Sequence, residues 1–132
     1  MQGSAVKRQI PAFIVHRRYR SFSMTHVVTL NKQNFAETIL QGEGIALVDF
    51  WAERCEHCLA LAPVIDRLAE NYSGRVLVGK LDVDSNPDIC RQCKVLGLPT
   101  VIIYKNGQVQ DQLMCSRSYE EYAEKLDELL KM

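Results

Sequence analysis

Short apolar segments of strand type alternate with helical segments along most of this chain, and this alternation strongly limits the folds open to it. The segment 45–52 is apolar except for Asp49, which is typical of a central strand buried on both faces. Helices that connect consecutive strands place those strands in one sheet and cover its faces. The pattern predicts an α/β fold in which a central mixed β-sheet is flanked by α-helices.

Capping and turn residues indicate where the expected helices and strands begin and end. Asn31 and the pair Asn86-Pro87 are typical of helix starts, and Ser118 with Glu121 has the spacing of a capping box. Asn106-Gly107 is a strong signal for a tight turn between two strands. We therefore expect strands at residues 27–30, 45–52, 76–83, 100–104 and 109–114, and helices at residues 31–41, 56–72 and 87–93 and from residue 118 onward.

The chain has 132 residues, enough for one domain with its own core. We place this domain at residues 24–132, because residues 1–23 contain Arg and Ser, lack acidic residues and show no clear periodicity. This basic N-terminal extension resembles a mitochondrial-type targeting peptide, and residues 20–23 are similar to a matrix-processing site. Alternatively, translation starts at Met24. We expect a cytoplasmic protein, or a matrix protein if the extension is a transit peptide.

Charge is unevenly distributed along the chain. Residues 1–36 hold six of the 16 Lys and Arg and none of the 16 Asp and Glu, so residues 37–132 have a net charge of −6. An acidic body argues against binding to nucleic acid or to an anionic membrane surface. No stretch approaches the ~20 consecutive apolar residues that span a bilayer. We expect a monomer without nucleic-acid or membrane partners.

The sequence Cys55-Glu56-His57-Cys58 begins where the buried strand gives way to a helix. The first N–H groups of a helix are unpaired and its N-terminus is partly positive, so a thiolate is favoured at Cys55. Cys58 lies about one turn further on the same face, where it can attack a mixed disulfide formed on Cys55. This pattern predicts thiol–disulfide exchange, with Cys55 as the nucleophile and Cys58 as the resolving cysteine.

The segment 48–58 resembles the active-site segment of the thioredoxin family. The resemblance implies the thioredoxin fold and a protein-disulfide reductase that carries electrons between proteins. It covers about residues 27–130 without large insertions, and a lone CxxC motif would be much weaker evidence than this ordered set. The further matching segments are residues 62–63, 80–84, 86–87, 97–100 and 104–107.

The resemblance also implies roles for residues outside the cysteine pair. Pro99 matches the cis-proline that faces the cysteines and, with Leu98, lines the substrate groove. Asp49 matches a buried carboxylate behind the second cysteine; burial should raise its pKa and let it accept that cysteine's proton. Lys80 matches the lysine that accompanies this carboxylate. Trp51 should pack beside the site, where we expect it to contact substrates.

Three residues depart from the usual family pattern, which has Trp before the first cysteine and Gly-Pro between the two. An imidazolium at His57 favours the Cys55 thiolate and a more oxidising pair, as in protein disulfide isomerases, which also carry His there. Glu56 opposes this effect, whereas Arg54 restores positive charge. The reduction potential could therefore lie between about −270 and −180 mV. Because these residues flank Cys55, we also expect them to contact substrates.

Three further cysteines offer secondary redox sites. Cys90 and Cys93 form a second CxxC, but the 31-residue spacer from the first is longer than in zinc ribbons, and we expect no metal. This second pair is either a regulatory or relay disulfide or two ordinary helix cysteines. Cys115 stands where the family usually has glycine near the docking surface, and it either faces that groove or is a small semi-buried thiol.

These features predict an enzyme that reduces protein disulfides by dithiol exchange. The resemblance implies a thioredoxin reductase as electron donor and disulfide-forming proteins such as peroxiredoxins as clients. No glycine-rich phosphate loop is present, so we expect no cofactor beyond the redox-active Cys55–Cys58 disulfide. Two alternatives stay open: a more oxidising disulfide oxidase or isomerase tuned by His57, and a non-catalytic zinc-binding or interaction module.

Overall fold

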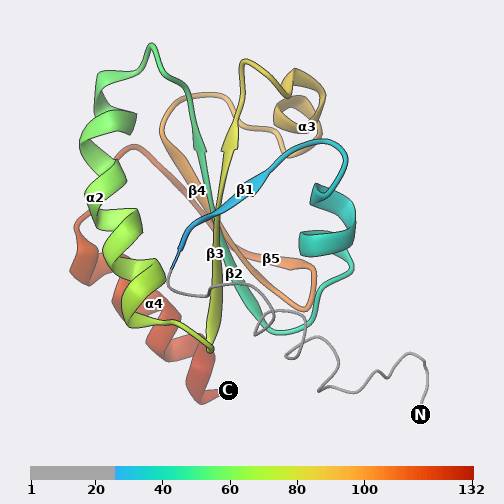
Figure 1. The fold of residues 1–132 in the computed structure, drawn as a ribbon. Helices are drawn as coiled ribbons and strands as arrows, with labels where there is room; N and C mark the ends of the chain where they lie inside the picture. The colour runs from blue at the N-terminus through green and yellow to red at the C-terminus, as the bar shows by residue number, and fades with distance from the viewer. Residues whose placement is uncertain (1–25) are drawn as a thin grey trace.

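The computed structural model describes residues 26–132, which form a five-stranded mixed sheet with strand order β1-β3-β2-β4-β5 (Figure 1). β1 and β2 both pair with β3 in parallel, whereas β4 runs antiparallel to β2 and to β5. This arrangement confirms the predicted fold class. The interpretations of residues 1–23 lie outside the described residues. The strands are β1 (Val28–Leu30), β2 (Ile45–Trp51), β3 (Val76–Asp82), β4 (Thr100–Lys105) and β5 (Gln108–Met114).

Helices cover both faces of this sheet. Figure 1 shows α2 and α4 on one side and α3 and the short helix η1 on the other, with the sheet between them. Within residues 26–132, no helix has the length and apolar character needed to cross a membrane. The helices are η1 (Ala36–Leu40), α2 (Glu56–Asn71), α3 (Pro87–Gln92) and α4 (Tyr119–Lys131).

The side chains of β2 alternate between two buried clusters, as the geometry of a strand requires. Val48 and Phe50 pack on the side of η1 and α3, whereas Leu47 packs on the side of α2 and α4. Each such fully buried side chain contributes about 1.5–3 kcal/mol to folding. Asp49 follows Leu47 by two residues, so its carboxyl enters the layer between the sheet and α2 and α4.

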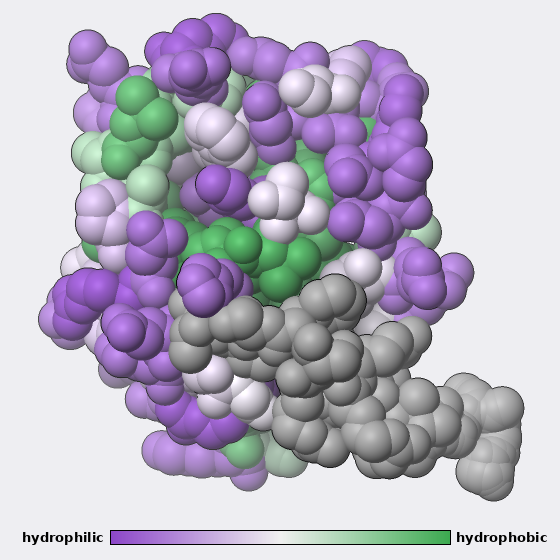
Figure 2. All heavy atoms as spheres, in the orientation of Figure 1, coloured by the Kyte–Doolittle hydropathy of each residue, from purple (hydrophilic) through white to green (hydrophobic). Residues whose placement is uncertain are grey.

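Polar residues form much of the outer surface of both helical layers, although α2 also exposes Leu59. Figure 2 shows apolar side chains in the middle of the face seen in Figure 1, in the hollow between these two polar surfaces. The core therefore lies along the sheet.

The helix predicted at residues 31–41 is wrong in its extent, because a turn replaces its first half. The Asn31 side chain accepts hydrogen bonds from the N–H groups two and three residues on, as a helix cap does, but the residues that follow it form a turn and the regular helix begins only at Ala36. The short helix η1 then has π-helical geometry. Its last hydrogen bond runs from the Gln41 N–H to the Ala36 carbonyl, over 2.9 Å.

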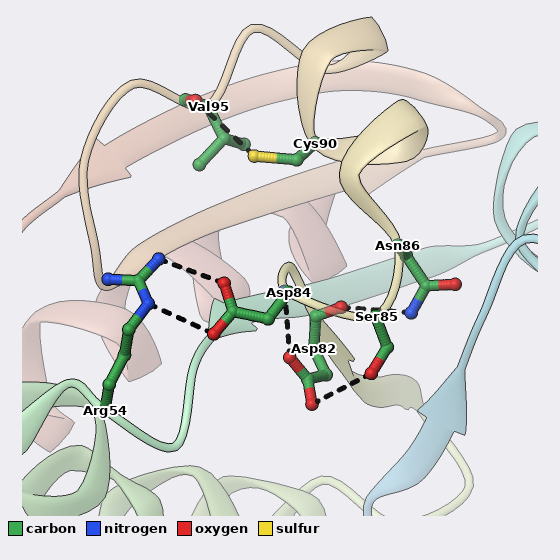
Figure 3. Close-up of polar contacts among 7 residues, drawn as sticks. All are labelled: Arg54, Asp82, Asp84, Ser85, Asn86, Cys90 and Val95. Carbon is green, nitrogen blue, oxygen red and sulfur yellow. Dashed lines mark hydrogen bonds and ion pairs between the residues drawn. The ribbon is translucent and has the colours of Figure 1, made fainter.

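Asn86 lies at the predicted start of α3, but its side chain does not cap that helix. Its amide donates a hydrogen bond to the Asp82 carbonyl (Figure 3), and its carbonyl oxygen accepts one from the Lys32 N–H. Asn86 therefore connects the end of β3 to the loop after β1.

Two other local signals are confirmed. Ser118 and Glu121 form the reciprocal capping box at the start of α4. Asn106 and Gly107 both have positive φ, 53° and 80°, as a two-residue hairpin turn between β4 and β5 requires.

Candidate active site

Cys55 lies at the N-cap position of α2, in the loop that leaves the buried strand β2. Its side chain caps the helix, because the Cys58 N–H donates a hydrogen bond to Cys55 Sγ over 3.2 Å. Caps usually use a side-chain oxygen for this bond. Here a sulfur nucleophile occupies the place where helix N–H groups and the helix dipole stabilise negative charge.

The two cysteines differ in their access to solvent. Cys55 is partly exposed, whereas only 2% of Cys58 is exposed. Burial raises the pKa of the Cys58 thiol, and its hydrogen bond and charge interaction with Cys55 raise it further, to about 12. Cys58 therefore holds its proton at neutral pH, and a base must remove that proton before Cys58 can attack a disulfide.

Asp49 is a buried carboxyl on β2, the strand that leads to the cysteine pair. Its side chain is buried, and the Oδ1 atom has no hydrogen-bond partner. Burial raises the pKa of Asp49 to about 7, although the positive charge of Lys80 acts in the opposite direction. Asp49 in turn contributes to the raised pKa of Cys58, which places the two groups within electrostatic reach of each other. A carboxyl with a pKa near 7 can both accept and release a proton at neutral pH.

Lys80 and Trp51 lie beside this carboxyl in the sheet. Lys80 is directly opposite Asp49 in the parallel pairing of β2 with β3. Its ammonium group lies 5.5 Å from the centre of the Trp51 ring, in a cation–π contact. The structure therefore brings together Asp49, Lys80 and Trp51.

The Leu98–Pro99 peptide bond is cis, and it leads directly into β4. Thr100 pairs with Phe50 in the antiparallel register, so Pro99 lies beside the end of β2 that leads to the cysteines. Leu98 and Cys55 also pack against the same buried cluster. Pro99 and Leu98 therefore lie at the same end of the sheet as the cysteine pair.

Arg54, Glu56 and His57 are exposed around Cys55. Asp84 holds the Arg54 guanidinium through two hydrogen bonds, of 3.1 and 3.0 Å (Figure 3), and raises its pKa. The positive charge expected of Arg54 is thus paired with a negative one. The sequence does not indicate this pairing, because nothing in the local pattern connects two side chains 30 residues apart.

Cys115 lies next to the cis-proline. Its backbone conformation is one that favours glycine, the residue usual at this position in the family. Its φ is +70°, in the left-handed region that favours glycine, and its N–H donates a hydrogen bond to the Pro99 carbonyl over 2.9 Å. The side chain is exposed, so the expectation of a semi-buried thiol is wrong.

Replacing Cys115 with glycine is expected to raise the free energy of unfolding by about 0.5–1 kcal/mol. The left-handed conformation costs a non-glycine residue about 1–2 kcal/mol, and the greater freedom of glycine in the unfolded chain offsets part of this gain. Urea unfolding under reducing conditions measures the difference. Cys115→Ala is the matched control and should not gain stability; equal values for both variants would contradict the argument.

The second cysteine pair lies at the end of a different helix. Cys90 is in α3, and Cys93 ends that helix. All five cysteines are free thiols. Across residues 26–132, no three His, Cys, Asp or Glu side chains gather in a way that could hold a metal ion.

Comparisons with known proteins agree with this arrangement. A family model described as Thioredoxin matches residues 26–128. The chain is 44% identical over 96 residues to thioredoxin 2 of Chlorobaculum tepidum, which covers 73% of this chain and 88% of that protein. It is 35% identical over 105 residues to a thioredoxin of Buchnera aphidicola (80% and 97% covered). It is 36% identical over 102 residues to a thioredoxin of Pseudomonas aeruginosa (77% and 94% covered).

The fold and these matches together define a thiol–disulfide oxidoreductase. The chain belongs to the thioredoxin family. This confirms the family and fold predicted from the segment 48–58 and its companion segments.

Proposed function

We propose that this protein reduces disulfides of other proteins by dithiol exchange, with Cys55 as the attacking cysteine and Cys58 as the resolving cysteine. The observation that carries the proposal is the unequal placement of the two sulfurs. Cys55 is accessible and receives a helix N–H, whereas Cys58 is buried behind it with a raised pKa. A client disulfide can reach the first sulfur and not the second.

In the first step, the Cys55 thiolate attacks one sulfur of the client disulfide and forms a mixed disulfide. The other client sulfur leaves as a thiolate. The client chain would contact Pro99 and Leu98 on one side of Cys55. The exposed side chains of Glu56 and His57 would border it on the other.

In the second step, Cys58 attacks the Cys55 sulfur, and the client leaves with both of its sulfurs reduced. The interaction with Cys55 raises the pKa of Cys58. This contribution disappears in the mixed disulfide, because the bonded Cys55 sulfur carries no charge. Asp49 then takes the Cys58 proton, directly or through a water molecule. The products are the Cys55–Cys58 disulfide and a client dithiol.

The cycle closes when a reductase returns two electrons to the Cys55–Cys58 disulfide. We propose a thioredoxin reductase for this step and disulfide-forming proteins such as peroxiredoxins as clients, because family members act between such partners. The cysteine pair itself carries the electrons, so these steps need no organic cofactor.

Replacing Cys58 with serine is expected to stop the reaction at the mixed disulfide. The reduced variant, mixed with insulin as a disulfide protein, should accumulate a covalent adduct that dithiothreitol dissolves. Peptide mass mapping should place this adduct on Cys55. The Cys55→Ser variant is the matched control and should give no such adduct, because the remaining Cys58 is buried. Adducts on Cys90, Cys93 or Cys115 instead would contradict the proposed roles.

A further inference from the structure

The end of α3 carries two thiols that the proposed exchange reaction does not use. Cys90 and Cys93 are three residues apart, which places them on one face of the helix. Both are partly buried and pack against the same cluster as Cys55 and Leu98. Cys90 also lies close enough to Cys93 for a charge on Cys90 to raise the pKa of Cys93.

We propose that Cys90 and Cys93 form a second redox-active dithiol, which disulfides of the glutathione class oxidise to an intramolecular disulfide. This site is separate from the Cys55–Cys58 pair. It does not depend on the function proposed for that pair.

The backbone around this pair can bring the two sulfurs together. Helical residues three apart have Cβ atoms about 5–6 Å apart, whereas a disulfide needs about 3.5–4.5 Å. Gln92 is the last residue of α3, and Cys93 and the left-handed Lys94 (φ 58°) already lie beyond its regular turns. The required approach therefore changes the last turn of a short helix, where the Cys93 N–H donates to the Ile89 carbonyl over 2.9 Å and the Val95 N–H donates to the Cys90 carbonyl over 3.1 Å.

Only weak interactions hold the two sulfurs in their present positions. The Cys90 thiol donates to the Val95 carbonyl over 3.6 Å (Figure 3), and Cys93 Sγ lies 3.8 Å from the Tyr104 hydroxyl. Hydrogen bonds of thiols are weak. Cys93 also lines a groove of about 260 Å³ that includes the exposed side chain of Val109, and Cys90 is itself partly exposed, so a small molecule can reach both thiols.

The oxidation proceeds in two exchange steps. Burial raises the pKa of Cys93, so Cys93 is the later of the two to react. The Cys90 thiolate attacks glutathione disulfide, forms a mixed disulfide with one glutathione and releases the other as a thiolate. Cys93 then loses its proton to solvent and displaces the bound glutathione. Two protein thiols are oxidised to one disulfide, and one glutathione disulfide is reduced to two glutathione molecules.

The full-length chain allows a direct test with glutathione disulfide as the probe. The protein is equilibrated in buffers of increasing glutathione disulfide content, alkylated and digested with trypsin, which cuts after Arg91, between the two cysteines. The disulfide should therefore link residues 81–91 to residues 92–94, with loss of the two alkylated peptides. Cys55 and Cys58 lie together in residues 55–67, and Cys115 lies in residues 106–117, so each site is followed separately in the same digest.

The Cys93→Ser variant is the matched control. It should give no linked peptide and should keep glutathione on Cys90, because the resolving thiol is missing. The proposal is overturned if both cysteines of the wild-type chain stay alkylated in buffers that fully oxidise residues 55–67. It is also overturned if each cysteine carries its own glutathione, or if either one links to residues 106–117. None of these results bears on Cys55 and Cys58.

Discussion

Replacing Cys55 with serine is expected to lower the rate of insulin reduction by dithiothreitol by at least about 10³-fold, to the rate without protein. A hydroxyl cannot form a disulfide. Cys58, the only other thiol of the pair, is buried, and its raised pKa keeps it protonated at neutral pH. Neither the attack on the client nor the storage of two electrons is then available.

The matched control for this variant is Cys93→Ser, which removes a thiol at the end of α3. Dithiothreitol keeps Cys90 and Cys93 reduced, so this control should retain the wild-type rate. If Cys55→Ser retained the wild-type rate as well, another thiol would carry the reaction, and the site described at the start of α2 would be wrong.

Replacing Asp49 with asparagine is expected to raise the free energy of unfolding at pH 8 by about 2–4 kcal/mol. Burial raises the pKa of Asp49 in the fold from 3.8 to about 7. Between these two values the unfolded chain releases a proton that the folded chain keeps, so the stability of the wild type falls as the pH rises. Each unit of difference in pKa corresponds to about 1.4 kcal/mol, and the buried amide of asparagine reduces the gain.

Urea unfolding at several pH values under reducing conditions tests this expectation. The difference between Asp49→Asn and the wild type should be small near pH 4, grow through pH 7 and then level off. Cys58 does not affect the pH dependence between pH 4 and 7, because its thiol titrates above this range in both states, with a pKa of 9.0 in the unfolded chain and about 12 in the fold. Asp66→Asn, which removes a carboxyl at an exposed position on α2, is the matched control. A variant no more stable than the wild type at pH 8 would contradict the burial cost assigned to Asp49.

Features that depend on local pattern could be predicted from the sequence. The apolar run around Asp49 indicated β2 and the burial of this carboxyl, because a strand covered on both faces must be apolar throughout. Asn106-Gly107 indicated its hairpin because few other residues tolerate two positive φ values. The cis peptide bond before Pro99 followed from the resemblance to the family, and not from local propensity.

Features that depend on distant partners could not be predicted. The Asn86 side chain satisfies the Lys32 N–H, 54 residues away, instead of its own helix. Asp84 pairs with Arg54, so the cation beside Cys55 is partly offset, which local charge patterns did not indicate. The left-handed backbone of Cys115 could not be predicted either, because it accompanies a hydrogen bond from the Cys115 N–H to the distant Pro99 carbonyl.

The most direct test of the central claim is a redox titration of the purified protein in glutathione and dithiothreitol buffers, with alkylation mapped to each cysteine by mass. We expect Cys55 and Cys58 to lose alkylation together as one two-electron couple, between about −270 and −180 mV. A value near the lower limit supports the reductant, and a value near the upper limit supports the oxidase or isomerase that His57 would favour. If Cys55 and Cys58 formed no disulfide at any potential, the claim that this pair carries the exchange would be wrong.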